Sequence, residues 1–236
     1  MEVNNPKYKG QGIHLIASIF TIDQGELKVL LIKRKNEPFA SSWALVGGAL
    51  YNDEDLENGL AREIYEKTGL TDIEVRLANV FGKKNRSPVM RMVAISYIGM
   101  VDKEKVNIFQ NTLKTSNADW FSINEIPNLA YDHNEIVLDA CEKLKQSILT
   151  WPILKVFFPD GFTLPELQKL YESILKKKFD RRNFKKKLLQ SGKIIPTEEQ
   201  RLFEGKKKAK VYRLLEENEF AHLSFPCNSK IEKENL

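Results

Sequence analysis

The chain has 236 residues, 42% hydrophobic and 29% charged, which is the composition of a globular protein rather than of a disordered one. No apolar run reaches the roughly 18 residues that a membrane helix needs, and the first residues lack the pattern of a signal peptide. The two cysteines, Cys141 and Cys227, are too far apart to form a zinc motif. We therefore expect a cytoplasmic protein that makes no use of a membrane, of zinc or of a structural disulfide.

The net charge of +5 is unevenly distributed along the chain. Residues 151–236 hold 19 Lys and Arg against 12 Asp and Glu, whereas residues 1–150 hold 18 against 20. A basic half behind a slightly acidic half indicates two domains with different tasks. Because Trp151-Pro152 breaks the pattern of the first half, we place the domains at 1–150 and 151–215, followed by a polar tail at 216–236.

Strands and helices are mixed in the first domain. A helix is expected from Asp53 to Lys67, because Leu56, Leu60 and Ile64 recur at helical spacing and Gly69 stands at the C-terminal cap. This mixture indicates an α/β or α+β domain. The other expected elements are strands at 13–20, 27–32, 43–46, 73–80, 89–101 and 118–122, a turn at 23–26 and a helix at 135–149.

The strongest motif runs from Gly48 to Leu70. It consists of Gly48, Glu54, Arg62-Glu63-Ile64, Glu66 and Gly69-Leu70. This stretch resembles the Nudix box, of which eight of the nine specified positions match at the required spacing. The resemblance implies a Nudix fold, in which a mixed sheet lies between helices.

The spacing of the box places its acidic residues on one face of a helix. Residues three and four positions apart share a helix face, so Glu63, Glu66 and position 67 lie together. Clustered carboxylates can hold Mg²⁺, which neutralises a diphosphate and activates water. Glu63 and Glu66 are therefore the candidate catalytic and metal-binding residues, and the resemblance implies that Arg62 orients them.

The ninth position of the box, a glutamate and metal ligand in the family, is Lys67 here. Two unit charges ~4 Å apart at an effective dielectric constant of ~20 interact by about 4 kcal/mol, and a divalent ion roughly doubles this value. We expect Mg²⁺ to bind weakly or not at all, with Lys67 pairing with Glu63 instead. Pyrophosphatase activity should then be low or absent, whereas ligand binding through aromatic and backbone groups does not need the metal.

Several other residues of the first domain are candidates for a ligand pocket. Aromatic side chains could stack on adenine, basic ones could meet phosphate, and a glycine pair lets the backbone approach phosphates. We expect His14 to be a satisfied core histidine, and Asp132 or Asn134 to cap the following helix, with no catalytic role for His133. The candidate ligand-binding residues are Arg34, Trp43, Gly47, Gly48, Arg62 and Arg86, with Lys33, Phe39, Phe81 and Arg91 as weaker candidates.

The second domain has the element order of a winged helix. Thr163 and Glu166 form a capping box that opens a first helix. A second helix, Arg181–Gln190, is capped by Asp180 and ended by Gly192. Two strands, at 194–195 and 211–214, are expected to follow around a lysine-rich loop. Helix, turn, helix and hairpin is the order of a winged helix-turn-helix.

Residues 162–213 hold 16 basic and 6 acidic side chains, a density that suits contacts with DNA phosphates. The second helix would enter the major groove, where Arg and Asn can read bases, while the lysines of the wing would hold the backbone. The candidate DNA-binding residues are Arg181, Arg182, Asn183, Lys185, Lys186, Lys187, Lys206, Lys207 and Lys208.

A specific resemblance covers residues 10 to 215. Phe162-Thr163-Leu164, Leu167-Gln168, Tyr171-Glu172 and the run from Asp180 to Lys187 resemble the C-terminal domain of Nudix-related transcriptional regulators. These include regulators of NAD metabolism that sense ADP-ribose, and sugar-responsive relatives. The resemblance implies a homodimer on a palindromic operator and a Nudix domain that often senses without catalysis.

The favoured hypothesis is therefore a DNA-binding transcriptional regulator whose degenerate Nudix domain senses an ADP-ribose-like nucleotide or a sugar derivative. The alternative is an active Nudix hydrolase that uses Mg²⁺ to cleave a nucleoside diphosphate derivative such as ADP-ribose. A third hypothesis combines the two as an enzyme and regulator in one chain.

Overall fold

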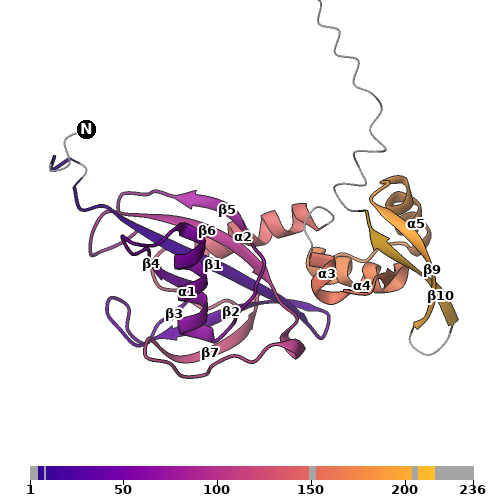
Figure 1. The fold of residues 1–236 in the computed structure, drawn as a ribbon, viewed down its shortest axis with the longest axis horizontal. Helices are drawn as coiled ribbons and strands as arrows, with labels where there is room; N and C mark the ends of the chain where they lie inside the picture. Colours follow the sequence, from indigo (N-terminus) through magenta and orange to yellow (C-terminus); the bar gives the residue numbers. More distant parts are fainter. Residues whose placement is uncertain (1–4, 8, 149–152, 204–206, 216–236) are drawn as a thin grey trace, which may run out of the picture. The chain divides into compact units, whose positions relative to one another are not determined.

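The computed structural model describes residues 5–7, 9–148, 153–203 and 207–215 (Figure 1). They divide into two compact units with the boundary between Pro159 and Asp160, except that residues 169–178 group with the first unit. The expected boundary after residue 150 and the expected tail at 216–236 both fall outside the described residues. Among the described residues, none of the helices has the length and hydrophobicity of a membrane span.

The first unit is built around one long central strand, β1 (Gly12–Asp23). β1 pairs antiparallel with β2 and β4 and parallel with β6, so the sheet is mixed. Gln24 and Gly25, with φ of 51° and 79°, connect β1 to β2 in the conformation of a tight hairpin turn. The remaining strands are β2 (Glu26–Arg34), β3 (Trp43–Ala44), β4 (Val46–Ala49), β5 (Val75–Phe81), β6 (Met92–Met100) and β7 (Thr115–Ser122), with β5 next to β6 and both β3 and β7 next to β2.

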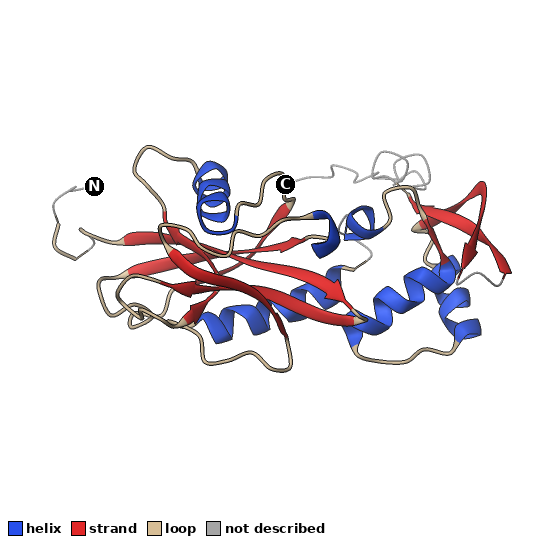
Figure 2. Ribbon diagram, turned by 90° about the horizontal axis from the view of Figure 1, so that it is seen from below, coloured by secondary structure: helices blue, strands red, loops and turns tan. Residues whose placement is uncertain are grey.

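Helices cover both faces of this sheet (Figure 2). Residues 14–21 of β1 are all buried, which requires cover on both sides because successive side chains point to opposite faces. α1 (Leu56–Thr68) packs against β1 and β4, and α2 (His133–Ser147) packs against β1, β5 and β6. A short 3-10 helix, η1 (Lys103–Lys105), follows β6.

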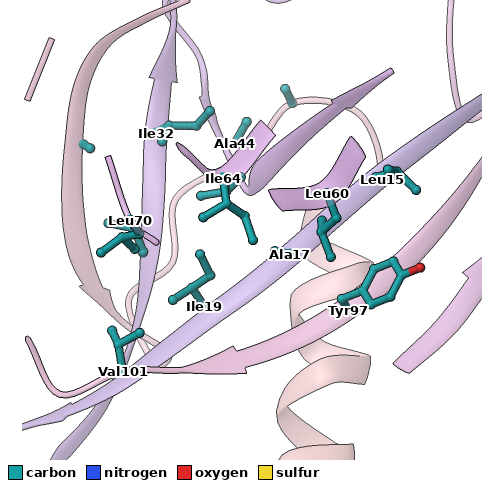
Figure 3. Close-up of a cluster of buried hydrophobic side chains, with 14 residues drawn as sticks. Leu15, Ala17, Ile19, Ile32, Ala44, Leu60, Ile64, Leu70, Tyr97 and Val101 are labelled. Carbon is teal, nitrogen blue, oxygen red and sulfur yellow. The ribbon is translucent and has the colours of Figure 1, made fainter. Parts of the chain in front are cut away.

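The core of the first unit lies between α1 and the sheet. Leu60 and Ile64 of α1 belong to the same buried cluster as side chains from β1 and β2 (Figure 3). Each such side chain contributes roughly 1.5–3 kcal/mol on burial. This packing fixes the orientation of α1 about its axis and thereby the direction in which its carboxylates point. The labelled partners are Leu15, Ala17, Ile19, Ile32, Ala44, Leu70, Tyr97 and Val101.

The second unit is a winged helix, preceded in the chain by α3 (Ile153–Phe157). The predicted capping box is confirmed, because Thr163 N–H donates to Glu166 Oε2 at 2.7 Å and Glu166 N–H donates to Thr163 Oγ1 at 3.4 Å. The predicted cap at Asp180 is also confirmed by a 2.9 Å bond from Asn183 N–H. The elements of the winged helix are β8 (Phe162–Thr163), α4 (Leu164–Leu175), of which residues 169–175 group with the first unit, α5 (Arg181–Gln190), β9 (Ile194–Phe203) and β10 (Lys207–Leu214), with β10 between β8 and β9.

The boundaries of several elements differ from the sequence prediction. α1 starts at Leu56 rather than Asp53, because the Glu54 carboxylate accepts Tyr51 N–H at 3.1 Å and holds the preceding residues in a turn. β9 and β10 are much longer than the two apolar runs that predicted them. Their polar positions are held by pairing between the strands, which hydrophobic patterning does not detect.

Two leucines on the helices are exposed. Leu138 is 61% exposed because Ile136, Ala140 and Leu144 define the buried stripe of α2, and Leu138 lies about 200° around the helix from Ile136. Leu189 of α5 is 41% exposed, next to the buried Leu188.

Candidate ligand pocket and DNA-binding surface

The acidic residues of the box are paired with cations. Lys67 and Glu63, one helical turn apart, are 6% and 2% exposed, and Lys67 Nζ lies 2.8 Å from Glu63 Oε2. Lys67 also donates to the carbonyl oxygen of Gly47. Arg62 donates to Glu63 Oε1 at 2.5 Å and to both carboxylate oxygens of Glu54. Burial alone would raise the pKa of Glu63, but the charges of Lys67, Arg62 and Lys114 outweigh burial and lower it.

Lys114, which was not among the residues predicted from the sequence, adds a further cation to this cluster. Its Nζ lies 2.6 Å from Glu66 Oε2 and 3.6 Å from Glu63 Oε1. Lys114 stands just before β7, in a polar segment without any motif, so only the fold brings it to α1. The three carboxylates are thus balanced by Arg62, Lys67 and Lys114, and the cluster is formally neutral.

These pairings do not fit a divalent ion. In the described part of the chain, no group of at least three His, Cys, Asp or Glu side chains is arranged to hold a metal. Mg²⁺ binding would require Lys67 to leave Glu63 and Lys114 to leave Glu66, and would place the ion beside two ammonium groups.

Gly47 and Gly48 allow close packing in and beside the cluster. A Cβ atom at Gly47 would clash with the carbonyl oxygen of Leu15, and one at Gly48 would clash with the carboxylate of Glu63. Both glycines also line the pocket described next. Their packing role is additional to the approach to phosphates that the sequence suggested.

A pocket of about 390 Å³ opens beside the cluster. Glu63, Lys67 and Lys114 contribute to its wall, and among the predicted ligand-binding residues it is lined by Arg34, Gly47 and Gly48. The other predicted ligand-binding residues lie elsewhere, namely Trp43 against Phe121 with ring centroids 4.7 Å apart, Arg62 on the box carboxylates, and Arg86 on Asp132 at 2.7 and 2.9 Å.

The pocket also has an aromatic wall around Tyr131. The ring of Tyr131 lies 4.7 Å from that of Phe39 and 5.9 Å from that of His14, measured between centroids. The guanidinium of Arg34 lies 5.3 Å from the centre of the Tyr131 ring. Tyr131 and His14 line the pocket, so aromatic and cationic groups face the same space. A nucleotide offers the matching features, because it combines a flat base with negative phosphates.

The prediction that His14 is a satisfied core histidine is wrong in one respect. His14 is 7% exposed, but its Nδ1 has no hydrogen-bond partner in the structure, and the residue lines the pocket. Burial, followed by the charges of Lys67 and Arg86, lowers the pKa of His14 to about 3, so the ring is neutral. The ring of His133 lies 5.9 Å from that of His14, measured between centroids, and His133 Nδ1 accepts Leu45 N–H at 3.1 Å. Burial lowers the pKa of His133 as well.

The expected helix cap at Asp132 or Asn134 is also corrected. Asp132 stands at the N-cap position of α2, but its side chain makes no capping bond and instead forms the ion pair with the buried Arg86. Asn134 Oδ1 accepts Leu129 N–H at 2.8 Å, and its amide donates to Pro127 O at 2.9 Å. Both side chains therefore hold neighbouring segments in place.

The second unit presents a different arrangement of cations. Phe184 and Leu188 of α5 are buried, which turns the polar side chains of the helix outward. Within the described residues, none of the basic side chains of α5 forms an ion pair. The exposed predicted DNA-binding residues are Arg181, Arg182, Asn183, Lys185, Lys186 and Lys187 on α5 and Lys208 on β10.

Basic residues of α5 and of the wing lie close together. Arg181 and Lys185 of α5 line one pocket of about 260 Å³ together with Lys208 and Lys210 of β10. Lys206 and the side chain of Lys207 lie outside the described residues. Arg181 and Lys185 of the helix and Lys208 and Lys210 of the wing thus form one basic surface, as expected for contacts with phosphates.

Comparisons with known proteins match both units. A family model described as NUDIX domain matches residues 12–140, and one described as NrtR DNA-binding winged helix domain matches residues 156–214. These matches confirm the predicted fold class, a Nudix domain followed by a winged helix. Over 200 residues the chain is 30% identical to the ADPR responsive transcriptional repressor NtrR of Acinetobacter baylyi, covering 83% of this chain and 79% of that protein.

Two further relatives bear on function. Over 131 residues the chain is 33% identical to an ADP-ribose pyrophosphatase of Methanocaldococcus jannaschii, covering 54% of this chain and 73% of that protein. The crystal structure of Shewanella oneidensis NrtR complexed with a 27mer DNA is similar, with 28% identity, a TM-score of 0.67 and coverage of 86% and 93%. The Nudix domain of the same protein, complexed with ADP ribose, matches with 28% identity, a TM-score of 0.54 and coverage of 59% and 93%.

Proposed function

This chain belongs to the family of Nudix-related regulators that join a Nudix domain to an NrtR winged helix, and we propose that it is a DNA-binding repressor controlled by an ADP-ribose-like nucleotide. The observation that carries this proposal is the contrast between the two sets of cations. Lys67 and Lys114 beside the box are paired with carboxylates, whereas the cations of α5 are exposed and without ion pairs in the described structure.

The ligand is proposed from the chemistry of the pocket. Arg34 and Lys114 are placed to meet a diphosphate, and Tyr131, against which Phe39 packs, offers aromatic surface to a base. The solved Nudix domain of the Shewanella relative is complexed with ADP ribose, which has these features. Because the box carboxylates are already neutralised, binding should not require a divalent ion.

DNA binding is proposed for α5 and the wing. Exposed Arg and Lys side chains displace counterions from DNA phosphates, and Asn183 and the two arginines of α5 can form hydrogen bonds with base edges. A two-fold symmetric operator is bound by two copies of the chain. The family resemblance supports such a homodimer, and we propose one on that ground. The ligand controls repression only if it binds the DNA-bound and free states unequally.

The proposal is tested by footprinting the DNA upstream of the gene for this chain and of its neighbours, with and without ADP-ribose, in EDTA and in Mg²⁺. We expect a protected, two-fold symmetric site whose occupancy changes with ADP-ribose equally in both buffers. The absence of a protected site in every buffer would contradict DNA-binding regulation. A ligand effect confined to Mg²⁺ would contradict metal-independent sensing.

An active hydrolase is the second candidate, favoured by the identity to the pyrophosphatase and by the retained Glu63 and Glu66. It predicts turnover of ADP-ribose in Mg²⁺ or Mn²⁺ that is abolished by Glu63→Gln. The pairing of both glutamates with lysines argues against this candidate, so we expect no turnover above that of the Glu63→Gln variant.

A further inference from the structure

We infer that Lys114 is a second block to divalent-ion binding, independent of Lys67, so that restoring the glutamate of the box at position 67 is not sufficient to rebuild a metal site. This inference deepens the proposed function, because it rests on a pocket that senses its ligand without a metal. It differs from what the box motif suggests, since the motif attributes the defect to position 67 alone.

The two lysines cover different carboxylate oxygens. Lys67 Nζ is 2.8 Å from Glu63 Oε2, while Lys114 Nζ is 2.6 Å from Glu66 Oε2 and 3.6 Å from Glu63 Oε1. Removing Lys67 therefore frees one oxygen of Glu63 and leaves Glu66 paired. An ion placed between Glu63 and Glu66 would still be repelled by the ammonium of Lys114.

Lys114 is held at this place by the fold. It follows Glu66 by 48 positions in the sequence, and the segment that carries it is tied to the end of α1. Phe109 N–H donates to Thr68 O at 2.9 Å, and Thr115 Oγ1 donates to Lys67 O at 3.3 Å. The lysine thus reaches Glu66 from a segment anchored on both sides, and neither anchor involves the side chain of Lys67.

Lys114 is the more exposed of the two lysines. Its side chain is 35% exposed and that of Lys67 is 8% exposed, so solvent screens the charge of Lys114 more than that of Lys67. We therefore expect Lys114 to be the weaker of the two blocks.

The test measures Mn²⁺ binding by calorimetry and by the electron paramagnetic resonance signal of free Mn²⁺. The proteins are the wild type, Lys67→Glu, Lys114→Gln and the double variant. We expect no saturable binding to the wild type or to Lys114→Gln, weak binding to Lys67→Glu, and binding about tenfold tighter or more in the double variant.

A matched control adds Lys103→Gln to Lys67→Glu. Lys103 is 29% exposed and lies 2.8 Å from Asp23, so this control removes a similar ion pair away from the pocket. It should leave the Mn²⁺ affinity of Lys67→Glu unchanged. Equal Mn²⁺ affinities of Lys67→Glu and the double variant would overturn the inference, as would an equal gain from the control.

Stability provides a second readout of Mn²⁺ binding. Lys67→Glu places a like charge beside Glu63, and a bound Mn²⁺ ion would offset the resulting repulsion. The unfolding temperature is measured with and without Mn²⁺, and Lys67→Gln replaces Lys67→Glu in both backgrounds if the latter does not fold. Stabilisation by Mn²⁺ should be larger when Lys114 is also replaced, and equal stabilisation would overturn the inference. Failure of the proposed function would appear separately, as a wild type that binds neither DNA nor ADP-ribose.

Discussion

The Nudix domain and the winged helix use the same residue type in opposite ways. Lys67 is 6% exposed and paired within the domain, so its charge is neutralised by Glu63. Lys185 and Lys186 are exposed and have no ion-pair partner in the described structure, so their charges remain for a partner molecule. A lysine-rich sequence therefore indicates binding only where the fold leaves its charges unpaired.

The strongest effect is expected from reversing charge on α5. Lys185→Glu combined with Lys186→Glu should weaken operator binding by about 100-fold or more at physiological salt, because the interactions with phosphate become repulsive. The salt dependence of the affinity should become shallower by about one unit for each lysine–phosphate interaction that the variant removes. Fluorescence anisotropy with labelled operator DNA measures both quantities.

The affinity for ADP-ribose should be unchanged in the same variant, which separates the two sets of cations. Lys83→Glu combined with Lys84→Glu makes the same charge change in the Nudix domain and serves as the control. An equal loss of DNA binding in this control would show that net charge, and not α5, carries the interaction.

The buried histidines should make stability depend on pH. The unfolded chain binds a proton at His14 below about pH 6.5, whereas the folded chain, with a pKa of about 3, does not. The contribution of His14 to the free energy of unfolding is therefore greatest above pH 6.5, and it falls by about 1.4 kcal/mol per pH unit as the pH drops below this value. Chemical denaturation between pH 7 and pH 4 should show a shallower loss in His14→Asn than in the wild type.

The same slope in both proteins would mean that His14 has the same pKa in the folded and the unfolded chain. This result would break the contrast between a Nudix domain that holds neutral buried histidines and a winged helix whose described residues include none.

Substitutions at two glycines distinguish the cost of a steric clash from the cost of an unfavourable backbone conformation. Gly48→Ala should destabilise the protein by about 3 kcal/mol, because the new methyl group overlaps the ion-paired carboxylate of Glu63. Gly192→Ala meets no atom within 4 Å, but its φ of +66° costs about 1 kcal/mol. Urea denaturation measures both, and equal losses would contradict the close approach at Gly48.

The smallest effect concerns the helix caps. Thr163→Ala should cost about 1 kcal/mol, because it removes the hydroxyl that accepts Glu166 N–H. Asp55 stands at the N-cap of α1 without a capping bond from its side chain, so Asp55→Ala should cost only a few tenths of a kcal/mol. Thermal unfolding compares the two variants, with Thr163→Ser as the conservative control for the first.

The features that the sequence predicted correctly depend on neighbours along the chain. The box spacing predicts the shared helix face of Glu63 and Lys67, and Asp180 predicts the start of α5, because both follow from the geometry of one helix turn. The pairing of Lys67 with Glu63 is an interaction of the same local kind.

Residues that meet across long stretches of chain could not be predicted in this way. The fold brings Lys114 to Glu66, Arg86 to Asp132, and Tyr131 to His14, and it leaves Trp43 outside the pocket lining. No periodicity or motif marks these partners, because their proximity follows from how strands pair and helices pack. The order of amino acids alone specified the type of each domain and its local caps, whereas the three-dimensional packing set which charges are neutralised and which remain free.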